Sequence, residues 1–269
     1  MGPVRSLYNG VDIPEIGFGT FRMDDDAARL AVYEAVQAGY RHIDTASFYG
    51  NEYGVGQALK ESGVSREELF ITSKVWNTEQ GFHAAMRAFD ESRHRLDTEY
   101  LDLYLIHWPK DLSMQTWSAL EKLYEDGKVR SIGVSNFKIH HLQELLDGGE
   151  MVPMVNQVEL HPQFPQKRLR GFCSKFDILI EAWGPLMQGE AFAHPLLIEL
   201  ADQYRRSISQ IVLRWHLQTG SIPLPKTTHS DRMRENLMVY DFELSQEDMQ
   251  RIGDIAGSRI GPDPDSITF

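Results

Sequence analysis

The sequence predicts an α/β fold, a (β/α)8 TIM barrel with an N-terminal β-hairpin. Eight short apolar segments alternate with longer amphipathic segments, a pattern that is typical of parallel βαβ units. The length of 269 residues also suits one such barrel, which takes about 250 residues. Eight repeats favour a closed barrel over the alternative of an open doubly wound sheet. Because no linker or composition break interrupts the chain, we expect a single domain over residues 1–269.

The expected hairpin turns at Asn9-Gly10, a two-residue turn signal between the apolar runs 6–8 and 11–13. The eight barrel strands are expected at residues 15–19, 41–44, 69–75, 101–107, 129–135, 154–159, 178–182 and 221–225. Helical patterns lie between them, at residues 25–38, 52–62, 81–96, 114–126, 140–147 and 207–218. Residues 261–269 contain two prolines, and we expect them to form an ordered coil.

Charge and cysteine content exclude several classes of function. The formal net charge of −12 disfavours binding to nucleic acid or to anionic membranes, so neither is expected as a partner. The single cysteine, Cys173, rules out an intramolecular disulfide and a cysteine-based metal cluster. No secretory signal and no apolar run of about 20 residues is visible. We therefore expect a cytoplasmic protein, and a monomer.

Four polar residues stand at the ends of the predicted strands two to four, or directly after them. They are Asp44, Tyr49, Lys74 and His107. Polar residues at the C-terminal end of barrel strands are typically catalytic. Each also has a structural alternative: Asp44 as a helix cap, Tyr49 as a core aromatic, and His107 as a hydrogen-bonded strand-end histidine. Lys74 is harder to explain structurally, because a lysine among apolar neighbours needs a charge partner when it is buried.

Together, these four side chains suit the delivery of a proton to an oxygen while a hydride reaches the adjacent carbon. A free tyrosine has a pKa of about 10, and a nearby lysine ammonium lowers that pKa by favouring the phenolate. A carboxylate paired with Lys74 would orient the lysine and offset the cost of burying it. A neutral His107 could donate a hydrogen bond to a carbonyl oxygen and polarise it.

The sequence resembles the aldo-keto reductase family almost end to end, and most closely its short bacterial members of the diketogluconate reductase and methylglyoxal reductase type. The matching stretches are HIDTASFYGNE, TSKVW, LYLIHWP, GKVRSIGVSNF, NQVELHP, EAWGPL and LPKTTHSDRMREN. The family's four catalytic residues fall on Asp44, Tyr49, Lys74 and His107. The resemblance implies NADPH-dependent reduction of aldehydes and ketones, including dicarbonyls and aromatic aldehydes, to alcohols, with Tyr49 as the proton donor.

The resemblance also implies a site for NADPH across the barrel mouth, without a Rossmann fold, and the sequence lacks a convincing GxGxxG motif. By match to the family, Ser135, Asn136 and Gln157 bind the nicotinamide carboxamide and Trp183 stacks on the nicotinamide ring. Lys226, Thr227 and Arg232 fall on the pocket for the 2′-phosphate, and Asn236 on an adenine contact. Arginine and lysine suit phosphate by their fork and point charge. The structural alternatives are solvated charges at Lys226 and Arg232, and core packing at Trp183.

The substrate pocket is expected to be aromatic and open. By resemblance, Phe21, Trp76, His107 and Trp108 line it. The segment after His107 and the C-terminal segment are both shorter than in many animal members, so we expect an open outer rim and broad specificity. Gly184 departs from the serine that the family often has in the AWxPL stretch, which puts one pyrophosphate contact in doubt.

Two other functions are possible from the sequence. One is a non-catalytic NADPH-binding regulatory subunit, because some relatives attach to ion channels. The other is an unrelated barrel hydrolase or isomerase that uses paired carboxylates or a metal. Glu159 and His161 could contribute metal ligands at a strand end, but a structural role is the simpler interpretation, and we expect no metal. The physiological substrate does not follow from the fold.

Overall fold

The computed structural model describes residues 2–269 and contains an eight-stranded parallel sheet in the order β10-β9-β8-β7-β6-β5-β4-β3. Backbone amides of Gly17 and Gly19 donate to the carbonyl oxygens of Pro223 and Pro225 at 3.1 Å, so the first and last strands also join. The closed barrel is confirmed over the open sheet. Its strands are β3 (Phe18–Gly19), β4 (His42–Asp44), β5 (Phe70–Val75), β6 (Leu103–Ile106), β7 (Ile132–Ser135), β8 (Val155–Glu159), β9 (Leu179–Trp183) and β10 (Ile222–Pro223).

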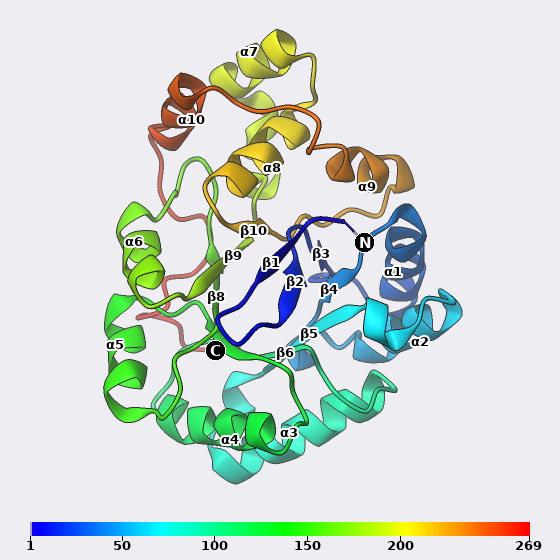
Figure 1. The fold of residues 1–269 in the computed structure, drawn as a ribbon, viewed down its shortest axis with the longest axis vertical. Helices are drawn as coiled ribbons and strands as arrows, with labels where there is room; N and C mark the ends of the chain where they lie inside the picture. The colour runs from blue at the N-terminus through cyan, green and yellow to red at the C-terminus, as the bar shows by residue number, and fades with distance from the viewer. Residues whose placement is uncertain (1) are drawn as a thin grey trace.

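A ring of helices surrounds the barrel (Figure 1). One α-helix follows each strand from β3 to β8, and two follow β9. They are α1 (Asp25–Ala38), α2 (Glu52–Glu61), α3 (Phe82–Arg95), α4 (Ser113–Glu125), α5 (Ile139–Gly148), α6 (Lys167–Lys175), α7 (Pro195–Tyr204), α8 (Ile208–Gln218), α9 (Ser230–Leu237) and α10 (Gln246–Gly253). Short 3-10 turns are η1 (Ser47–Tyr49), η2 (Arg66–Glu68), η3 (Asn77–Glu79) and η4 (Met187–Ala193). The six expected helices are confirmed, while α6, α7, α9 and α10 were not among them.

The N-terminal hairpin is confirmed, but its turn differs from the expected one. Strand β1 (Val4–Ser6) pairs antiparallel with β2 (Asp12–Pro14). The Leu7 amide donates to the Val11 carbonyl at 2.8 Å, which leaves a three-residue loop at 8–10. A two-residue type I′ turn needs positive φ at both central residues, and only Gly10 (φ 85°) has it. In Figure 1 the hairpin lies across the barrel at the N-terminal ends of the strands.

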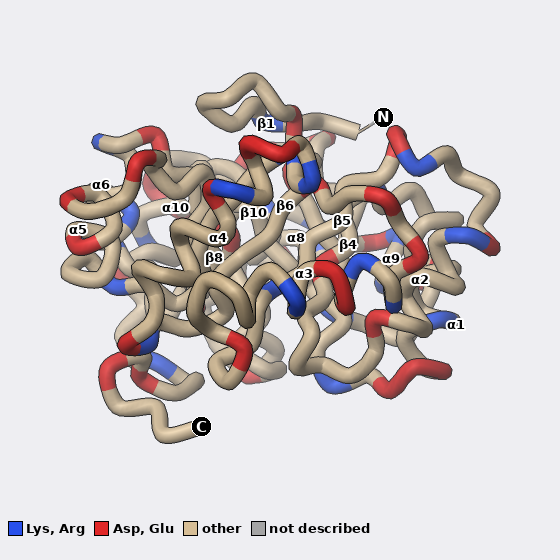
Figure 2. The backbone as a smooth tube through the Cα atoms, turned by 90° about the horizontal axis from the view of Figure 1, so that it is seen from below, with Lys and Arg blue, Asp and Glu red and all other residues tan. Residues whose placement is uncertain are grey.

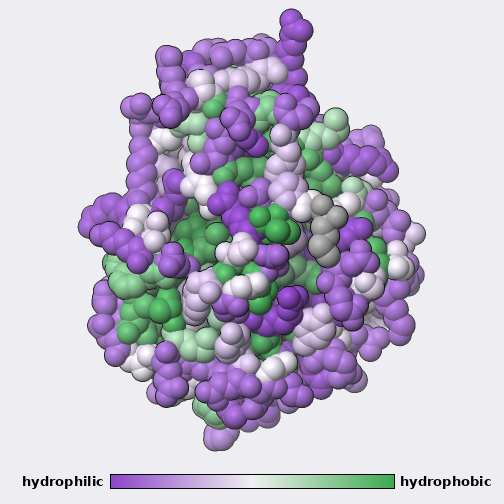
Figure 3. Space-filling view, viewed as in Figure 1, coloured by the Kyte–Doolittle hydropathy of each residue, from purple (hydrophilic) through white to green (hydrophobic). Residues whose placement is uncertain are grey.

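Charged residues of both signs occur along the whole chain. Figure 2 shows Lys and Arg spread among Asp and Glu along the chain. The hairpin face in Figure 3 is largely hydrophilic at its periphery, with hydrophobic residues exposed in small patches between. Within residues 2–269, no helix combines the length and the apolar character needed to cross a bilayer.

Candidate active site

A cleft of about 730 Å³ opens at the C-terminal ends of the barrel strands. It is lined by all but one of the residues that the sequence analysis expected to act in catalysis or to bind cofactor or substrate: Phe21, Asp44, Tyr49, Trp76, His107, Trp108, Ser135, Asn136, Gln157, Trp183, Lys226, Thr227, Arg232 and Asn236. The exception is Lys74, which lies completely buried beneath the cleft. The structure thus gathers residues from most of the chain's length at one end of the barrel.

Lys74 and Asp44 form a buried ion pair under the cleft. The strands β4 and β5 are neighbours in the sheet, which brings the two side chains together inside the barrel. The Lys74 Nζ donates to both Asp44 carboxylate oxygens, at 2.7 and 2.9 Å, and to the Thr45 carbonyl at 2.9 Å. It also lies 3.4 Å from the Tyr49 hydroxyl oxygen. The lysine is therefore held with its charge facing both Asp44 and the phenol.

The pKa values of Lys74 and Tyr49 are set by burial and by the same ion pair. Burial lowers the pKa of Lys74, but the charge and hydrogen bond of Asp44, with the ionised forms of Tyr49 and Glu181, outweigh burial, so the net pKa is raised and the ammonium is kept. Burial raises the pKa of Tyr49, and the opposing effect of Lys74 is smaller. Lys74 therefore acts in the expected direction, but the expected net lowering of the tyrosine pKa is wrong for this state of the protein. At neutral pH Tyr49 keeps its proton.

His107 follows β6 and presents a neutral imidazole beside Tyr49. Burial, and then the charge of Lys74, hold its pKa well below the usual range. The two rings lie 5.6 Å apart between centroids, and the ring of Trp76 is 5.0 Å from the imidazole. Within residues 2–269 the imidazole makes no hydrogen bond of its own, so it is free to donate one to a bound molecule.

Asn136 and Trp183 form a rigid polar wall of the cleft. The Asn136 side-chain amide donates to the His107 carbonyl at 3.0 Å, and its oxygen accepts from the Trp183 indole nitrogen at 2.8 Å. Ser135 donates to the Gln157 carbonyl at 2.9 Å. These bonds, with one from the Asn136 amide to the Ser135 hydroxyl at 3.1 Å, fix the indole of Trp183 and connect four expected cofactor residues.

The other end of the cleft is cationic. Lys226 follows β10, Arg232 lies on α9, and Arg22 follows β3, the strand that adjoins β10 where the barrel closes. Burial, and then the charge of Arg22, lower the pKa of Lys226. None of these three side chains forms an ion pair with another residue in 2–269. Unneutralised cations that face one another suit an anionic ligand such as phosphate. Arg22 was not expected here from the sequence, because no strand-end pattern distinguishes it.

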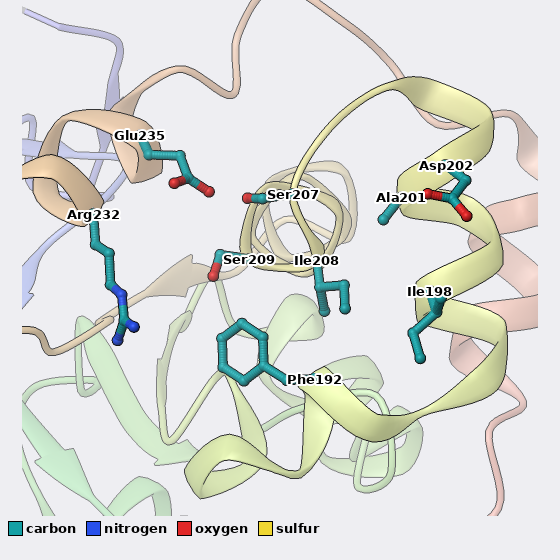
Figure 4. A pocket seen from close by; sticks show the side chains of 9 residues that line it. All are labelled: Phe192, Ile198, Ala201, Asp202, Ser207, Ile208, Ser209, Arg232 and Glu235. Carbon is teal, nitrogen blue, oxygen red and sulfur yellow. The ribbon is translucent and has the colours of Figure 1, made fainter.

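A side pocket of about 410 Å³ adjoins this cationic end (Figure 4). Phe192, Ser209 and Arg232 line both the side pocket and the main cleft. Figure 4 shows Arg232 and Glu235 projecting from α9 toward the start of α8 and the ring of Phe192. Arg232 therefore stands at the boundary between the two spaces.

The C-terminal residues cover part of the rim of the cleft, so the rim is less open than expected. The Phe269 ring stacks on Trp76 at 5.8 Å between centroids and meets Trp108 edge-on at 5.6 Å. The Asn77 side chain donates to the Phe269 carbonyl at 2.9 Å, and Lys110 donates to that of Ile267 at 3.0 Å. A short chain can still cover the rim because the tail runs back across the barrel mouth, which sequence spacing does not reveal.

The base of this tail is anchored by Glu159. Its carboxylate accepts from the backbone amides of Ile260 and Gly261, and from the His161 ring at 3.0 Å. The His161 ring and these backbone amides lower the pKa of Glu159 against the raising effect of burial. A Cβ on Gly261 would collide with the Trp183 ring, so the tail also packs against the cleft wall. Glu159 and His161 thus have structural partners that account for both residues.

Two further features of the cleft concern Phe48 and Gly184. Phe48, which was not expected from the sequence, stacks on Trp76 with ring centroids 3.7 Å apart. Gly184 has a φ of 63°, in the left-handed region where a residue with a Cβ is strained by about 1–2 kcal/mol. A serine would therefore be disfavoured in this backbone conformation.

The fold and the site define a (β/α)8-barrel protein whose cleft has a buried Lys–Asp pair beneath a tyrosine and a neutral histidine. Residues 15–256 match the aldo/keto reductase family. The chain is 52% identical over 266 residues to a glyoxal reductase of Bacillus subtilis, covering 98% of this chain and 96% of that protein. It is 44% identical over 271 residues to methylglyoxal reductase DkgA of Yersinia pestis, covering 98% and 97%.

A solved structure of a similar protein has the same fold. The chain matches a crystal structure of a Gox0644 mutant in complex with NADPH with a TM-score of 0.95 and 42% identity, covering 100% of both chains. The protein therefore belongs to the aldo/keto reductase family and is an oxidoreductase that acts on carbonyl compounds.

Proposed function

We propose that the protein reduces aldehydes and ketones, including dicarbonyls and aromatic aldehydes, to alcohols with NADPH, and that Tyr49 donates the proton. The observation that carries this proposal is the stack of Asp44, Lys74 and Tyr49, with the Lys74 Nζ 3.4 Å from the phenol oxygen and His107 beside it. The relatives named glyoxal reductase and methylglyoxal reductase support the substrate class. The NADPH complex of Gox0644 supports the cofactor.

The residues of this cleft fit NADPH along its length. The cations Arg22, Lys226 and Arg232 form no ion pair within the described residues 2–269 and suit its phosphates. The indole of Trp183 offers a flat face and Gln157 a polar group in the same cleft as Tyr49. When bound, NADPH supplies the hydride that reduces the carbonyl carbon.

The chain's own residues handle the proton and the charge. His107 is neutral, so it can donate a hydrogen bond to the substrate oxygen without competing for the proton. Tyr49 is protonated at neutral pH and gives its proton to that oxygen as negative charge develops on it. Lys74 stabilises the resulting phenolate, and Asp44 keeps the lysine in place. General acid catalysis of this kind contributes about 10²–10⁴-fold to a rate.

The pocket walls favour flat or apolar carbonyl compounds. Phe48, Trp76, Trp108 and Phe269 form a nearly continuous aromatic surface over the site, which also limits the access of water. Few polar groups other than those of the proposed mechanism reach this part of the cleft. We therefore propose broad specificity, with recognition by shape and stacking rather than by dedicated hydrogen bonds.

We also propose one domain over residues 1–269 and a monomeric, cytoplasmic protein. The support is that a single chain supplies every side chain of the site, and that its one cysteine is buried and unpaired. Light scattering at several protein concentrations tests the monomer: a constant mass of about one chain supports it, and a concentration-dependent mass contradicts it.

The direct test of the function is to mix purified protein with NADPH and either methylglyoxal or benzaldehyde, and to follow the absorbance of the reduced nicotinamide. Steady loss of absorbance with both substrates supports the proposal. A change in cofactor fluorescence without turnover would instead support a regulatory NADPH-binding protein. The absence of both signals would refute the proposed NADPH-dependent reduction.

A further inference from the structure

A second carboxyl group lies inside the barrel beneath the catalytic cleft. Glu181 of β9 is completely buried, and so is Gln157 of β8 except for about 2% of its surface. The Gln157 side-chain nitrogen donates to Asp44 Oδ2 at 2.7 Å and to Glu181 Oε2 at 2.8 Å. The strands β4 and β8 are not neighbours in the sheet, so the bond to Asp44 crosses the barrel interior.

This pair of acceptors fixes which way the Gln157 amide faces. A primary amide has two N–H donors on one side and a carbonyl acceptor on the other. Both donors are used by Asp44 and Glu181, so the carbonyl oxygen is left for the cleft that Gln157 lines. A reversed amide would place its oxygen against Oδ2 of the Asp44 carboxylate, and that buried acceptor would lose the donor that Gln157 now supplies. The orientation therefore depends on both carboxyl groups.

Glu181 is suited to this task because it does not bring a second negative charge to the Lys74–Asp44 pair. Burial, then the charge of Asp44, raise the pKa of Glu181 to about 8, against smaller opposing effects of Gln157 and Lys74. Burial and the charge of Lys74 lower the pKa of His42, on the far side of Glu181, to about 3. At neutral pH both groups are uncharged. The Glu181 Oε1 and the His42 Nε2 lie 3.4 Å apart, a contact between two uncharged groups.

We propose that Glu181 is a positioning residue for the cofactor: with Asp44, it orients Gln157 so that the amide oxygen receives the carboxamide of the nicotinamide. This inference rests on the NADPH site of the proposed function. The proposal connects the orientation of the cofactor with the proton-donor group, because the Asp44 carboxylate accepts hydrogen bonds from both Gln157 and Lys74. Glu181 itself touches neither substrate nor cofactor.

The test compares Glu181→Leu with Glu181→Gln, which keeps an oxygen acceptor for Gln157 and a donor for His42. Dissociation constants are measured by fluorescence titration for NADPH and for 2′,5′-ADP, which lacks the nicotinamide. We expect Glu181→Leu to weaken NADPH about tenfold, the value of one hydrogen bond, and to leave 2′,5′-ADP unchanged. Glu181→Gln should bind both ligands within about twofold of the wild type. Gln157→Leu should weaken NADPH to a similar extent, and the double variant should be no weaker than either single one.

Equal loss of NADPH and 2′,5′-ADP affinity in Glu181→Leu, or additive losses in the double variant, would overturn the proposal. If Glu181→Leu does not fold, hydrogen exchange of the Gln157 side-chain amide in the wild type tests the proposed amide orientation instead. Both protons should be protected without cofactor, and fast exchange would contradict the orientation. Because these readouts need no turnover, a protein that binds NADPH but reduces no carbonyl would refute the proposed function and leave this test readable.

Discussion

Replacing Lys74 by methionine should cost the protein both stability and activity, and the two losses should separate in a double variant. Lys74 is fully buried, and its ammonium makes two bonds to Asp44 and one to the Thr45 carbonyl. Methionine has a similar length but no charge, so Asp44 would remain buried without its counter-ion. Removing one partner of a buried pair typically costs about 3–5 kcal/mol of unfolding free energy.

The double variant Asp44→Asn/Lys74→Met removes both charges. The asparagine oxygen can still accept from Gln157, so the remaining hydrogen bond has a partner. Replacing a whole buried pair by neutral groups is often close to neutral in stability. We expect the double variant to recover most of the stability that Lys74→Met loses. It should not recover the rate, because the phenolate of Tyr49 would still lack the ammonium, a loss of about 10²–10³-fold.

Urea unfolding followed by tryptophan fluorescence gives the stabilities, and the rate of NADPH oxidation with methylglyoxal gives kcat. A double variant as unstable as Lys74→Met would show that the ion pair is not the source of the stability loss. A double variant with wild-type kcat would show that Lys74 acts only as a structural residue.

Three further predictions concern other parts of the site. Arg232→Ala should weaken the binding of NADPH roughly 10–100-fold and leave the binding of NADH nearly unchanged. Fluorescence titration with both cofactors tests this, and equal weakening would show that Arg232 does not contact the 2′-phosphate. Phe269→Ala removes the ring that packs on Trp76 and Trp108, so it should raise KM for benzaldehyde about 3–10-fold and change KM for methylglyoxal less. An equal rise in KM for both substrates would refute a stacking role. Glu181 stays protonated in the folded protein up to a pKa of about 8, whereas its ordinary value is 4.5, so it makes stability fall as pH rises between these values. Glu181→Gln should remove that fall, so at pH 8 the variant should exceed the wild type by up to a few kcal/mol in free energy of unfolding. Urea unfolding at pH 5 and pH 8 tests this, and a difference between the two proteins that is the same at both pH values would contradict it.

The repeating part of the fold could be predicted from the sequence because it is local. Each barrel strand is a short apolar run, and each expected helix has its own periodicity. Segments such as 41–44 and 69–75 can therefore be predicted as strands without knowing which strands they pair with. Asp44, Lys74 and His107 could be singled out for a related reason, since strand ends of a parallel barrel meet at one face.

The features that could not be predicted depend on contacts between distant segments. Phe269 lies at the rim because the tail returns to Trp76, far earlier in the chain, and no periodicity records such a contact. Glu181 is an ordinary strand residue until β4 and β8 place Asp44 and Gln157 next to it. The net pKa of Tyr49 could not be derived either, because it depends on how far burial outweighs Lys74. The turn at Gly10 differed because only one of its residues adopts positive φ.

The central claim is that Tyr49 donates the proton, and Tyr49→Phe tests it most directly. This change removes one hydroxyl and keeps the ring that contacts Phe21 and His107. We predict that the variant binds NADPH with a dissociation constant close to that of the wild type, while kcat for methylglyoxal falls by about 10²–10⁴-fold or more. Tyr49→Phe that bound NADPH normally and kept most of the wild-type kcat would contradict the account.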